Sequence, residues 1–262
     1  MAPDRAPHAP LDPAAYGDAF ADVYDDWYPD LGDPADVVRA LDRLTAPGSG
    51  PRRTVVELGV GTGRLALPLA ESGWTVIGLD SSPAMLAALG ARIRRAEAEG
   101  RITAGSITSR LADVTTADPW TDDVEVVLAS FNLLLNLPDA AAQAGTVGHA
   151  ARALRPGGVL VCETQVLDLA AAPAESVVVR DDGVRIESTV DAEAGVVAGR
   201  HVDPGSEVVR PWRLCALDPG RLDEMATAAG LVAEARWSDW LGSPFVPDDS
   251  PTSIAVYRRS PS

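Results

Sequence analysis

The sequence contains no lysine, only three histidines and only two cysteines in 262 residues. Its 22 basic residues are therefore all arginines, and 38 acidic residues outnumber them to give a formal net charge of −16. Such an acidic surface repels the phosphates of nucleic acids and the headgroups of anionic membranes. We therefore expect a chain with neither a nucleic-acid nor a membrane partner.

Long apolar runs are also missing. No stretch approaches the roughly 20 apolar residues of a membrane-spanning helix, and the proline-rich N-terminus has no apolar signal core. We expect a cytoplasmic protein with no metal site. Cys162 falls in an apolar run, which favours a free, packed thiol over a disulfide. Hydrophobic residues make up 46% of the chain, enough for the core of one α/β domain with a modest addition.

The stretch from Thr54 to Asp80, TVVELGVGTGRLALPLAESGWTVIGLD, is the most informative part of the chain. A β-branched apolar run, a glycine turn, a helical pattern and a second apolar run ending in an acid predict a nucleotide-binding βαβ unit. Glycine has no Cβ atom, so the turn can take positive φ and let a ligand approach the backbone. Asp80 is placed to accept hydrogen bonds from both hydroxyls of a ribose.

The spacing of the glycines differs from that of dinucleotide sites. Those sites use G-x-G-x-x-G, with a pyrophosphate at the helix N-terminus. Here Gly59, Gly61 and Gly63 form G-x-G-x-G, Glu57 precedes them, and Arg64 stands where the extra spacer would fall. A glycine turn that only packs a helix on a strand is the alternative interpretation.

Strand and helix patterns alternate from residue 54 to 163, which predicts a parallel sheet with helices on both faces. After Thr164 come β-rich runs separated by D-D-G, E-A-G and P-G-S turns, which predict a separate antiparallel sheet. Ser82 is expected to cap a helix that has Pro83 at its first position, and Asp218 to begin another. Strands are expected at 54–58, 75–79, 101–104, 124–129 and 158–163, in the antiparallel sheet at 176–180, 184–191, 196–202 and 208–216, and in a final antiparallel pair at 231–237 and 253–258.

These patterns divide the chain into four parts. Residues 1–13 are expected to be a disordered tail, and residues 14–50 a helical cap that ends in a linker at 47–51. Residues 51–168 and 217–262 are expected to form the α/β core. Residues 169–216 are expected to form an antiparallel β insertion, either a substrate lid or a dimer interface. The chain is expected to be a monomer or a homodimer.

Over nearly the whole chain, and most strongly from Val55 to Val161, this order resembles the class I S-adenosyl-L-methionine (SAM) dependent methyltransferases. VVELGVGTGR is similar to their first motif, GLDSSPAML to the second, LADV at 111–114 to the third, SFNLLLNL to the segment after the fourth strand, and LRPGGVLV at 154–161 to the turn into the fifth. ADVYDDWYP resembles the N-terminal helix of a small-molecule type that includes actinobacterial natural-product and amino-sugar N-methyltransferases. The resemblance implies a three-layer, Rossmann-like α/β fold with a seven-stranded, mostly parallel sheet, SAM as cofactor and S-adenosyl-L-homocysteine as product.

The resemblance also implies roles for individual residues. Asp80 would hold the ribose, while Tyr24 and Tyr28 would close over the sulfonium, whose positive charge an aromatic face attracts. The alternatives are a hydrophobic seam for the two tyrosines, plain helix core for Met85 and an Asx turn for Asp113. The other implied contacts are Glu57, Gly59, Gly61 and Gly63 at the methionine end, Ser81 and Met85 beside the adenine, Asp113 and Val114 at its edge, and Ser130 and Phe131 on the floor.

Methyl transfer from a sulfonium is an in-line displacement that depends mainly on proximity and orientation. A hydroxyl acceptor needs a base, whereas an amine needs only a site that binds its unprotonated form. The catalytic candidates are Tyr28, His201, which is the only histidine in a substrate-facing region, and Asn132, which with Asn136 could orient a substrate. Because no strong base stands out, we expect methyl transfer to nitrogen, with oxygen as the second possibility, on a small molecule of bacterial secondary metabolism.

The insertion also carries five arginines and a tryptophan. Trp212 could line an aromatic substrate pocket. The arginines could bind an anionic substrate group through bidentate contacts, but pairing with nearby acids on solvent-facing positions is the preferred interpretation. They are Arg180, Arg185, Arg200, Arg210 and Arg213.

Two other functions stay open. A SAM-binding enzyme that does not transfer the methyl group, such as a cyclase that uses the sulfonium charge, would carry the same cofactor motifs. A NAD-type oxidoreductase is disfavoured by the missing G-x-G-x-x-G pattern and by the LRPGG turn.

Overall fold

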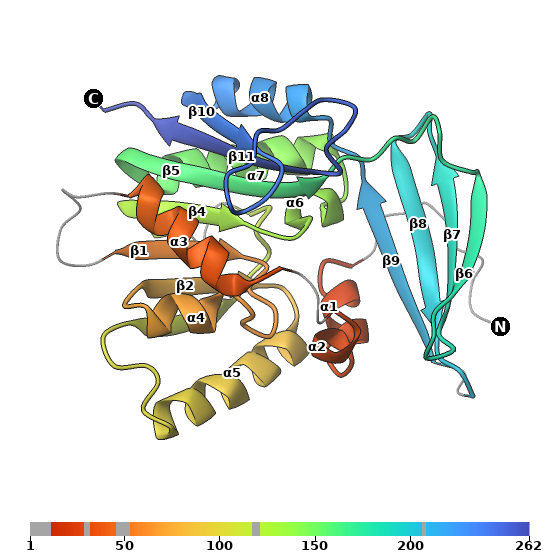
Figure 1. Cartoon of the computed structure of the whole chain (residues 1–262), viewed down its shortest axis with the longest axis horizontal. Coiled ribbons are helices and arrows are strands. Elements are labelled where there is room, and N and C mark those ends of the chain that lie inside the picture. The colour runs from red at the N-terminus through yellow and green to blue at the C-terminus, as the bar shows by residue number, and fades with distance from the viewer. Residues whose placement is uncertain (1–11, 29–31, 46–52, 117–120, 206–207, 262) are drawn as a thin grey trace.

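Two β-sheets organise the chain: a seven-stranded sheet flanked by helices and a four-stranded sheet beside it (Figure 1). The computed structural model describes residues 12–28, 32–45, 53–116, 121–205 and 208–261. Residues 1–11 of the predicted tail and the predicted linker at 47–51 lie outside the described residues.

The seven-stranded sheet has the order β10-β11-β5-β4-β1-β2-β3. All pairs from β3 to β5 are parallel, and β11 is antiparallel to both of its neighbours. This confirms the predicted Rossmann-like α/β fold and its antiparallel final pair of strands. The strands are β1 (Thr54–Leu58), β2 (Thr75–Asp80), β3 (Ser106–Leu111), β4 (Val124–Ala129), β5 (Leu154–Gln165), β10 (Leu231–Trp237) and β11 (Thr252–Arg259).

The central strands are apolar because helices cover both faces of the sheet. β4 is buried at all six positions and β1 at its last four. One core cluster joins the sheet to α3, α4 and α5, and the other joins it to α7 and α8. The strand order reverses between β1 and β4, which places a crevice at their carboxyl ends.

The longer helices begin at side-chain caps that the sequence supplies. Ser82 accepts a hydrogen bond from Met85 N with Pro83 at the first helical position, as predicted, and Asp218 caps α8. The helices are α1 (Ala15–Phe20), α2 (Tyr24–Trp27), α3 (Pro34–Leu44), α4 (Ala66–Glu71), α5 (Pro83–Ala98), α6 (Leu133–Asn136), α7 (Ala140–Ala153) and α8 (Pro219–Ala228).

One strand lies elsewhere than predicted. The strand expected at 101–104 is wrong, because β3 is formed by Ser106–Leu111. β3 is the edge of the sheet, and five of its six residues are exposed, Leu111 by 63%. An exposed edge strand needs no apolar alternation, so its sequence, SITSRL, gives no strand signal.

The four-stranded sheet is antiparallel throughout, with the order β6-β7-β8-β9. It stands apart from the main sheet at one side of the molecule (Figure 1). Its strands are β6 (Glu175–Val179), β7 (Arg185–Asp191), β8 (Val196–Val202) and β9 (Val209–Cys215), all between residues 169 and 216.

The short helices α1 and α2 lie between the two sheets (Figure 1). On the side of the four-stranded sheet, the buried Arg210 of β9 binds both carboxylate oxygens of Asp22, at 2.7 and 3.0 Å, and also donates to Ala19 O. The same guanidinium pairs with Asp203 at 3.2 Å and lies over the Trp27 ring. Arg210 therefore fastens the N-terminal helices to the insertion, where Phe20 and Trp27 also pack against His201 of β8.

On the side of the main sheet, the N-terminal segment is tied to α5 and to the glycine loop. Ser82 Oγ donates to Asp18 Oδ1 at 2.6 Å. Asp25 accepts from Thr62 Oγ1 at 2.7 Å and pairs with Arg92 at 2.8 Å. Gly17 permits this approach, since a Cβ atom there would lie 2.4 Å from Ser82 Cβ.

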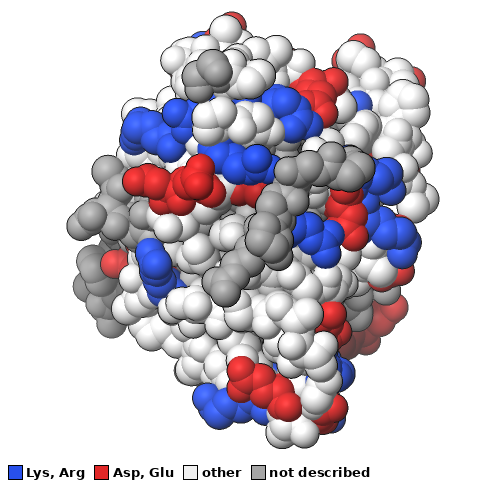
Figure 2. Space-filling model, turned by 90° about the vertical axis from the view of Figure 1, so that its left-hand side faces the viewer, with Lys and Arg blue, Asp and Glu red and all other residues white. Residues whose placement is uncertain are grey.

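Charges of both signs alternate on the surface. On the face shown in Figure 2, arginines and acids are interspersed. In the insertion, Arg180 pairs with Asp182, and Arg185 and Arg200 both pair with Glu187, as the preferred interpretation expects.

Both cysteines are buried free thiols, and burial raises the pKa of Cys162 to about 12. Within the described part of the chain, no helix has the length and apolar character needed to cross a membrane.

A glycine in β2 sets how the glycine loop packs, and its substitution tests this packing. A Cβ atom at Gly78 would lie 2.7–2.9 Å from the side chain of Val60 in the loop. We expect Gly78→Ala to lower the free energy of unfolding by about 1–3 kcal/mol, as overpacked cores do. The measurement is urea unfolding followed by circular dichroism.

Gly145→Ala is the matched control. Gly145 lies inside α7, and a Cβ atom there would meet nothing within 4 Å. This substitution is expected to raise the free energy of unfolding by about 0.5–1 kcal/mol through helix propensity. Equal effects of the two substitutions would contradict the packing argument.

Candidate active site

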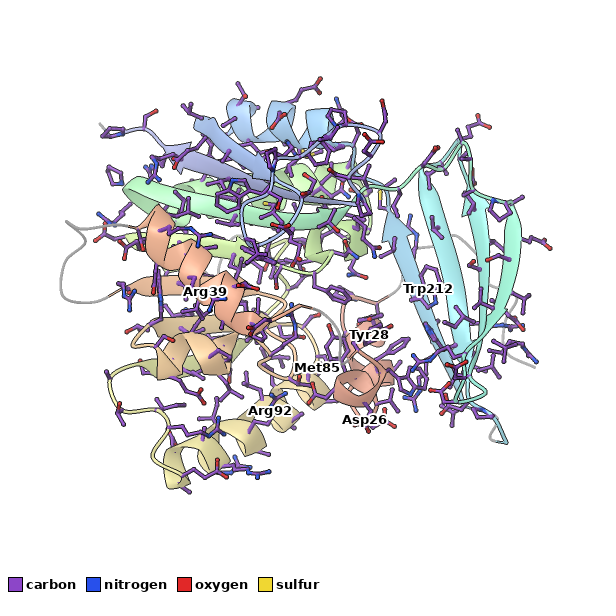
Figure 3. All side chains as sticks on the ribbon, viewed as in Figure 1. Asp26, Tyr28, Arg39, Met85, Arg92 and Trp212 are labelled. Atoms are coloured by element: carbon purple, nitrogen blue, oxygen red, sulfur yellow. The ribbon has the colours of Figure 1, made fainter. Side chains whose placement is uncertain are left out.

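A cavity of about 490 Å³ lies at the carboxyl ends of β1, β2 and β4, where the strand order reverses. Its walls also come from α1, α2 and the four-stranded sheet. Its volume falls within the range of about 300–1,000 Å³ that is typical of small-molecule sites. Figure 3 shows Met85 of α5, Tyr28 after α2 and Trp212 of β9 around the space between the two sheets, and all three line the cavity.

The glycine loop after β1 forms the wall nearest the sheet. Gly59 and Gly61 line the cavity, with positive φ of 66° and 54°. Gly63 also has positive φ, but it is not among the lining residues, and a Cβ atom there would lie 2.4 Å from the side chain of Leu89. Gly63 therefore allows α5 to pack on the loop. Packing is the role that the alternative interpretation gave to the whole glycine turn.

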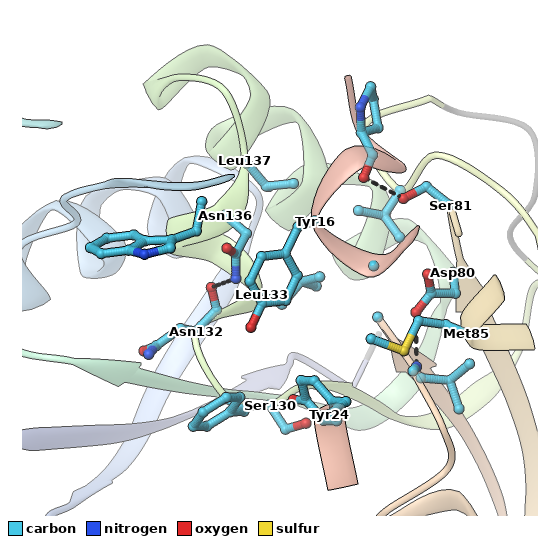
Figure 4. A pocket seen from close by; sticks show the side chains of 18 of the residues that line it. Tyr16, Tyr24, Asp80, Ser81, Met85, Ser130, Asn132, Leu133, Asn136 and Leu137 are labelled. Atoms are coloured by element: carbon cyan, nitrogen blue, oxygen red, sulfur yellow. Dashed lines mark hydrogen bonds between the residues drawn. The ribbon is translucent and has the colours of Figure 1, made fainter. Parts of the chain in front are cut away.

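Asp80 connects the glycine loop to the start of α5. Its Oδ2 atom accepts from Gly61 N and its Oδ1 atom from Ser82 N, both at 2.8 Å. Burial raises its pKa, while these backbone donors oppose the shift. A carboxylate offers about four acceptor sites, so two remain for a ligand. The side chain lines the cavity, as Figure 4 shows.

Glu57, near the end of β1, is a buried carboxyl group with an unsatisfied oxygen. It is 2% exposed, and its Oε2 atom has no hydrogen-bond partner among the described residues. Burial raises its pKa to about 8, Asp80 adds to the shift and Arg64 opposes it. Because an unpaired buried charge is costly, this position suits a positively charged ligand group.

The four residues that the resemblance places around the adenine all line the cavity. They are Ser81, Met85, Asp113 and Val114. Asp113 Oδ1 accepts from Thr115 N at 2.8 Å and from Thr115 Oγ1 at 2.7 Å, so Asp113 does form an Asx turn while facing the cavity.

The turn after β4 has an unusual backbone. Phe131 and Asn132 have φ of 43° and 63°, a left-handed conformation that costs energy in residues other than glycine. β5 holds this turn: Phe131 N donates to Glu163 Oε2 at 2.9 Å, and Gln165 N donates to Asn132 Oδ1 at 2.7 Å. Ser130, Phe131 and Asn132 all line the cavity, and the side-chain oxygen of Asn132 is used by the fold itself.

Aromatic side chains form the roof of the cavity. Tyr24 and Tyr28 have ring centroids 5.1 Å apart, and Tyr28 lies edge-on to Phe131 at 5.9 Å. Tyr16, to which no motif assigns a role, also lines the cavity, and its hydroxyl interacts with that of Tyr28. Burial raises the pKa of all three hydroxyls, so they stay protonated at neutral pH.

The four-stranded sheet closes the opposite end of the cavity. His201 is 6% exposed and lies against Phe20 and Trp27, with ring centroids 5.2 and 5.4 Å away. Burial, followed by the charge of Arg180, lowers its pKa to about 4, so the imidazole is neutral at pH 7. Trp212 and Arg213 line the same end, and Arg213 donates to Pro138 O at 2.9 Å.

The structure brings together every residue that the sequence analysis assigned to the site except Gly63. It adds residues that the motifs do not reveal, among them Tyr16, Gln165 and Ile186. Tyr16 lies in an aromatic-rich stretch with Phe20 and Tyr24, which is only a weak signal in the sequence. Gln165 and Ile186 gave none, because only the placement of β5 and β7 brings them to the cavity.

The residues present fit SAM. Two glycines without Cβ atoms leave the backbone open at the end of β1. The unsatisfied carboxyl oxygen of Glu57 suits an ammonium group, the free acceptor sites of Asp80 suit the two ribose hydroxyls, and the aromatic roof suits a sulfonium.

Comparison with known proteins points the same way. The methyltransferase domain family matches residues 55–158. Among solved structures, the chain is similar to the CcbJ methyltransferase from Streptomyces caelestis, with 30% identity and a TM-score of 0.83 over 95% of this chain and 100% of that one. No curated protein sequence matched the chain.

Two further solved structures share the fold. One is SAM-bound CalS10, an amino pentose methyltransferase from Micromonospora echinaspora, with 21% identity and a TM-score of 0.60 over 91% of this chain and 97% of that one. The other is the sugar N-methyltransferase KedS8 from a Streptoalloteichus species, with 23% identity and a TM-score of 0.64 over 96% and 98%.

Asp80→Asn tests the ribose contact. A hydrogen bond to a charged group contributes about 1.5–3 kcal/mol, so the variant is expected to bind S-adenosylhomocysteine about 10- to 100-fold more weakly. Isothermal titration calorimetry measures the affinity. Asp218→Asn, at the α8 cap and not among the residues that line the cavity, is the control and should bind as the wild type does. Unchanged affinity in Asp80→Asn would remove Asp80 from the binding site.

Proton release tests the role of Glu57. Its pKa of about 8 means that it is mostly protonated at pH 7 before a ligand binds. An ammonium group against Oε2 stabilises the carboxylate, so binding is expected to release up to about one proton. Binding of S-adenosylhomocysteine is measured by calorimetry at pH 7 in phosphate and in Tris. The two binding enthalpies should differ by the number of protons released multiplied by the difference between the ionisation enthalpies of the two buffers. The difference should vanish in Glu57→Gln; a difference that persists there would place the released proton on another group.

Proposed function

Because the chain belongs to the SAM-dependent methyltransferases, we propose that it transfers the methyl group of SAM to an amine nitrogen of a small molecule. The nicotinamide alternative finds no support among the comparisons. The acceptor atom is the part of the proposal that the cavity itself must support.

The observation that carries the proposal is the lack of a usable base at the acceptor end of the cavity. Among the described residues lining that end, between Tyr28 and the four-stranded sheet, the only titratable base is His201. Its pKa of about 4 makes it a poor proton acceptor at neutral pH. The tyrosine hydroxyls, with raised pKa values, hold their protons. A hydroxyl acceptor needs a base here, and an amine that enters unprotonated does not.

The chain's own residues would hold the donor and exclude water. Asp80 would bind the ribose hydroxyls, Glu57 the ammonium group, and Asp113 with Val114 the adenine. When bound, SAM supplies a methyl group already activated by its sulfonium. Tyr24, Tyr28 and Phe131 would place aromatic faces around that charge.

The acceptor end would orient the substrate. The amide NH₂ group of Asn132, the hydroxyl of Tyr28 and the neutral ring of His201 are the polar groups that we assign to this task. α1 and α2 cover the cavity, and this enclosure would keep water from the reacting groups, where a dry site strengthens electrostatic contacts. Proximity and orientation can contribute about 7–11 kcal/mol to such a reaction.

A cavity of about 490 Å³ between the main sheet, the N-terminal helices and the insertion suits a small acceptor better than a macromolecule. The net charge of −16 and the mixed charges on the surface in Figure 2 also speak against a nucleic-acid acceptor. The fold carries N-methylation in KedS8, which is named as a sugar N-methyltransferase. We accordingly place the reaction in the secondary metabolism of a bacterium and the protein in the cytoplasm.

The test uses SAM with a labelled methyl group and panels of small amines, alcohols and phenols. Label is expected in amines, with a rate that rises with pH as each amine loses its proton. No break is expected near pH 6.5, because His201 titrates at about 4. Methylated phenols or alcohols with inert amines would contradict the nitrogen assignment. Consumption of SAM without any methylated product would support the cyclase-like alternative instead.

A further inference from the structure

The inner face of the four-stranded sheet carries two enclosed polar atoms that the fold does not use. Trp212 Nε1 and His201 Nδ1 are both buried and without a hydrogen-bond partner among the described residues. His201 is 6% exposed, and both side chains line the cavity. Buried polar groups are nearly always paired in native proteins, so a pair of unsatisfied atoms in a cavity wall points to a ligand.

Strand register places these side chains on one face. Ile186 pairs with His201, and His201 with Arg210, while Gly199 pairs with Trp212 two residues away. Because side chains alternate along a strand, all five positions face the same side. Ile186, His201 and Trp212 line the cavity, and the centroids of the His201 and Trp212 rings lie 6.4 Å apart. The two unsatisfied atoms thus belong to one patch.

Gly199 leaves room for the indole ring of Trp212 against β8. A Cβ atom at Gly199 would lie 2.5 and 2.7 Å from two ring atoms of Trp212, and 2.4 Å from Glu187 O. The ring therefore lies flat against β8, a position that only glycine permits at that point of the strand. This fixes the apolar face and the N–H group of the indole relative to the cavity.

The charged side chain next to these residues on the same face, Arg210, already has carboxylate partners. Arg210 is bound by Asp22 and Asp203 and lies over Trp27. An indole N–H can only donate, whereas a neutral imidazole can donate or accept. The patch thus offers one obligatory donor, one adaptable nitrogen and a flat apolar surface.

We infer that Trp212 and His201 are specificity-determining residues that recognise a ring-bearing amine with an uncharged oxygen, such as a hydroxyl, ether or carbonyl, on the ring. The oxygen accepts from Trp212 Nε1, and the ring lies on the indole. This inference rests on the proposed amine acceptor and names its chemical class.

The test observes the indole directly, without turnover. The 262-residue chain, labelled with ¹⁵N and saturated with S-adenosylhomocysteine, is titrated with 3-hydroxypiperidine and separately with piperidine. The chain has six tryptophans, and loss of one indole signal in Trp212→Phe assigns the signal of Trp212. Trp212→Tyr serves the same purpose should the first variant not fold. We expect 3-hydroxypiperidine to move this signal and piperidine to leave it in place.

Kinetics with labelled SAM give the second readout. The ratio of kcat/KM for 3-hydroxypiperidine over piperidine is expected to be at least about tenfold in the wild type, the effect of one hydrogen bond of about 1.4 kcal/mol. It should fall to about one in Trp212→Phe. Trp237→Phe, at the end of β10, is the control and should keep the wild-type ratio.

The outcomes separate this inference from the proposed function. An indole signal that does not move in either titration, or moves equally in both, overturns the inference. Equal kcat/KM for the two amines overturns it while leaving nitrogen methylation intact. Methylation of the 3-hydroxypiperidine oxygen, with the indole signal still moved, would support the recognition patch and refute the amine acceptor.

Discussion

The site depends on one carboxylate at the end of β2. Asp80 accepts from Gly61 N in the glycine loop and from Ser82 N at the start of α5. It thereby joins the glycine loop to the start of α5, although Gly61 lies 19 residues before Asp80 along the chain. Each bond involves a charged acceptor and is therefore stronger than a neutral hydrogen bond. Glu57, Met85 and the loop glycines all stand on the segments that this carboxylate joins.

A second constraint builds the other half of the cavity. α1 and α2 have few residues, and neither could be a stable helix alone. They hold their place because Arg210 binds them from β9 while Ser82, Thr62 and Arg92 bind them from the core. The N-terminal segment thus links two sheets that share few other contacts. Its aromatic rings become walls of the cavity through this double attachment.

The sequence predicts the parts of this architecture that local pattern controls. Buried central strands, glycine turns and helix caps each leave a signature in a few consecutive residues, so β1, β4, the Ser82 cap and the order of motifs follow from the chain itself. β3 escapes because an exposed edge strand needs no apolar residues. Gly63 shows the limit of a motif, since its spacing is the same whether it meets a ligand or Leu89.

Residues that meet only through tertiary structure are harder to predict. Trp212 was suspected as an aromatic wall, but its seat on Gly199 depends on the register of β8 and β9. The low pKa of His201 depends on the rings of α1 and α2 that surround it, and nothing in the sequence around residue 201 reveals them. Gln165 lines the cavity, and its backbone N–H holds the strained turn at Asn132, a contact that depends on the placement of β5 beside that turn.

The two halves of the cavity differ in how they can change. In the half of the cavity proposed for the cofactor, backbone N–H groups, missing Cβ atoms and carboxylates at strand ends would do the binding, so most substitutions there would also disturb the loop that connects β1 to α4. In the half proposed for the acceptor, His201 and Trp212 would contribute contacts from one face of a separate sheet, beside Tyr28 and Asn132. Side chains at alternate positions of β7, β8 and β9 can be substituted without moving the main sheet, because they project from one face of a separate sheet. Positions 199 and 210 are exceptions, since any side chain at position 199 displaces the indole and Arg210 binds the N-terminal segment. With the roles proposed here, acceptor recognition would vary by substitution on the insertion while the site for the methyl donor stays fixed.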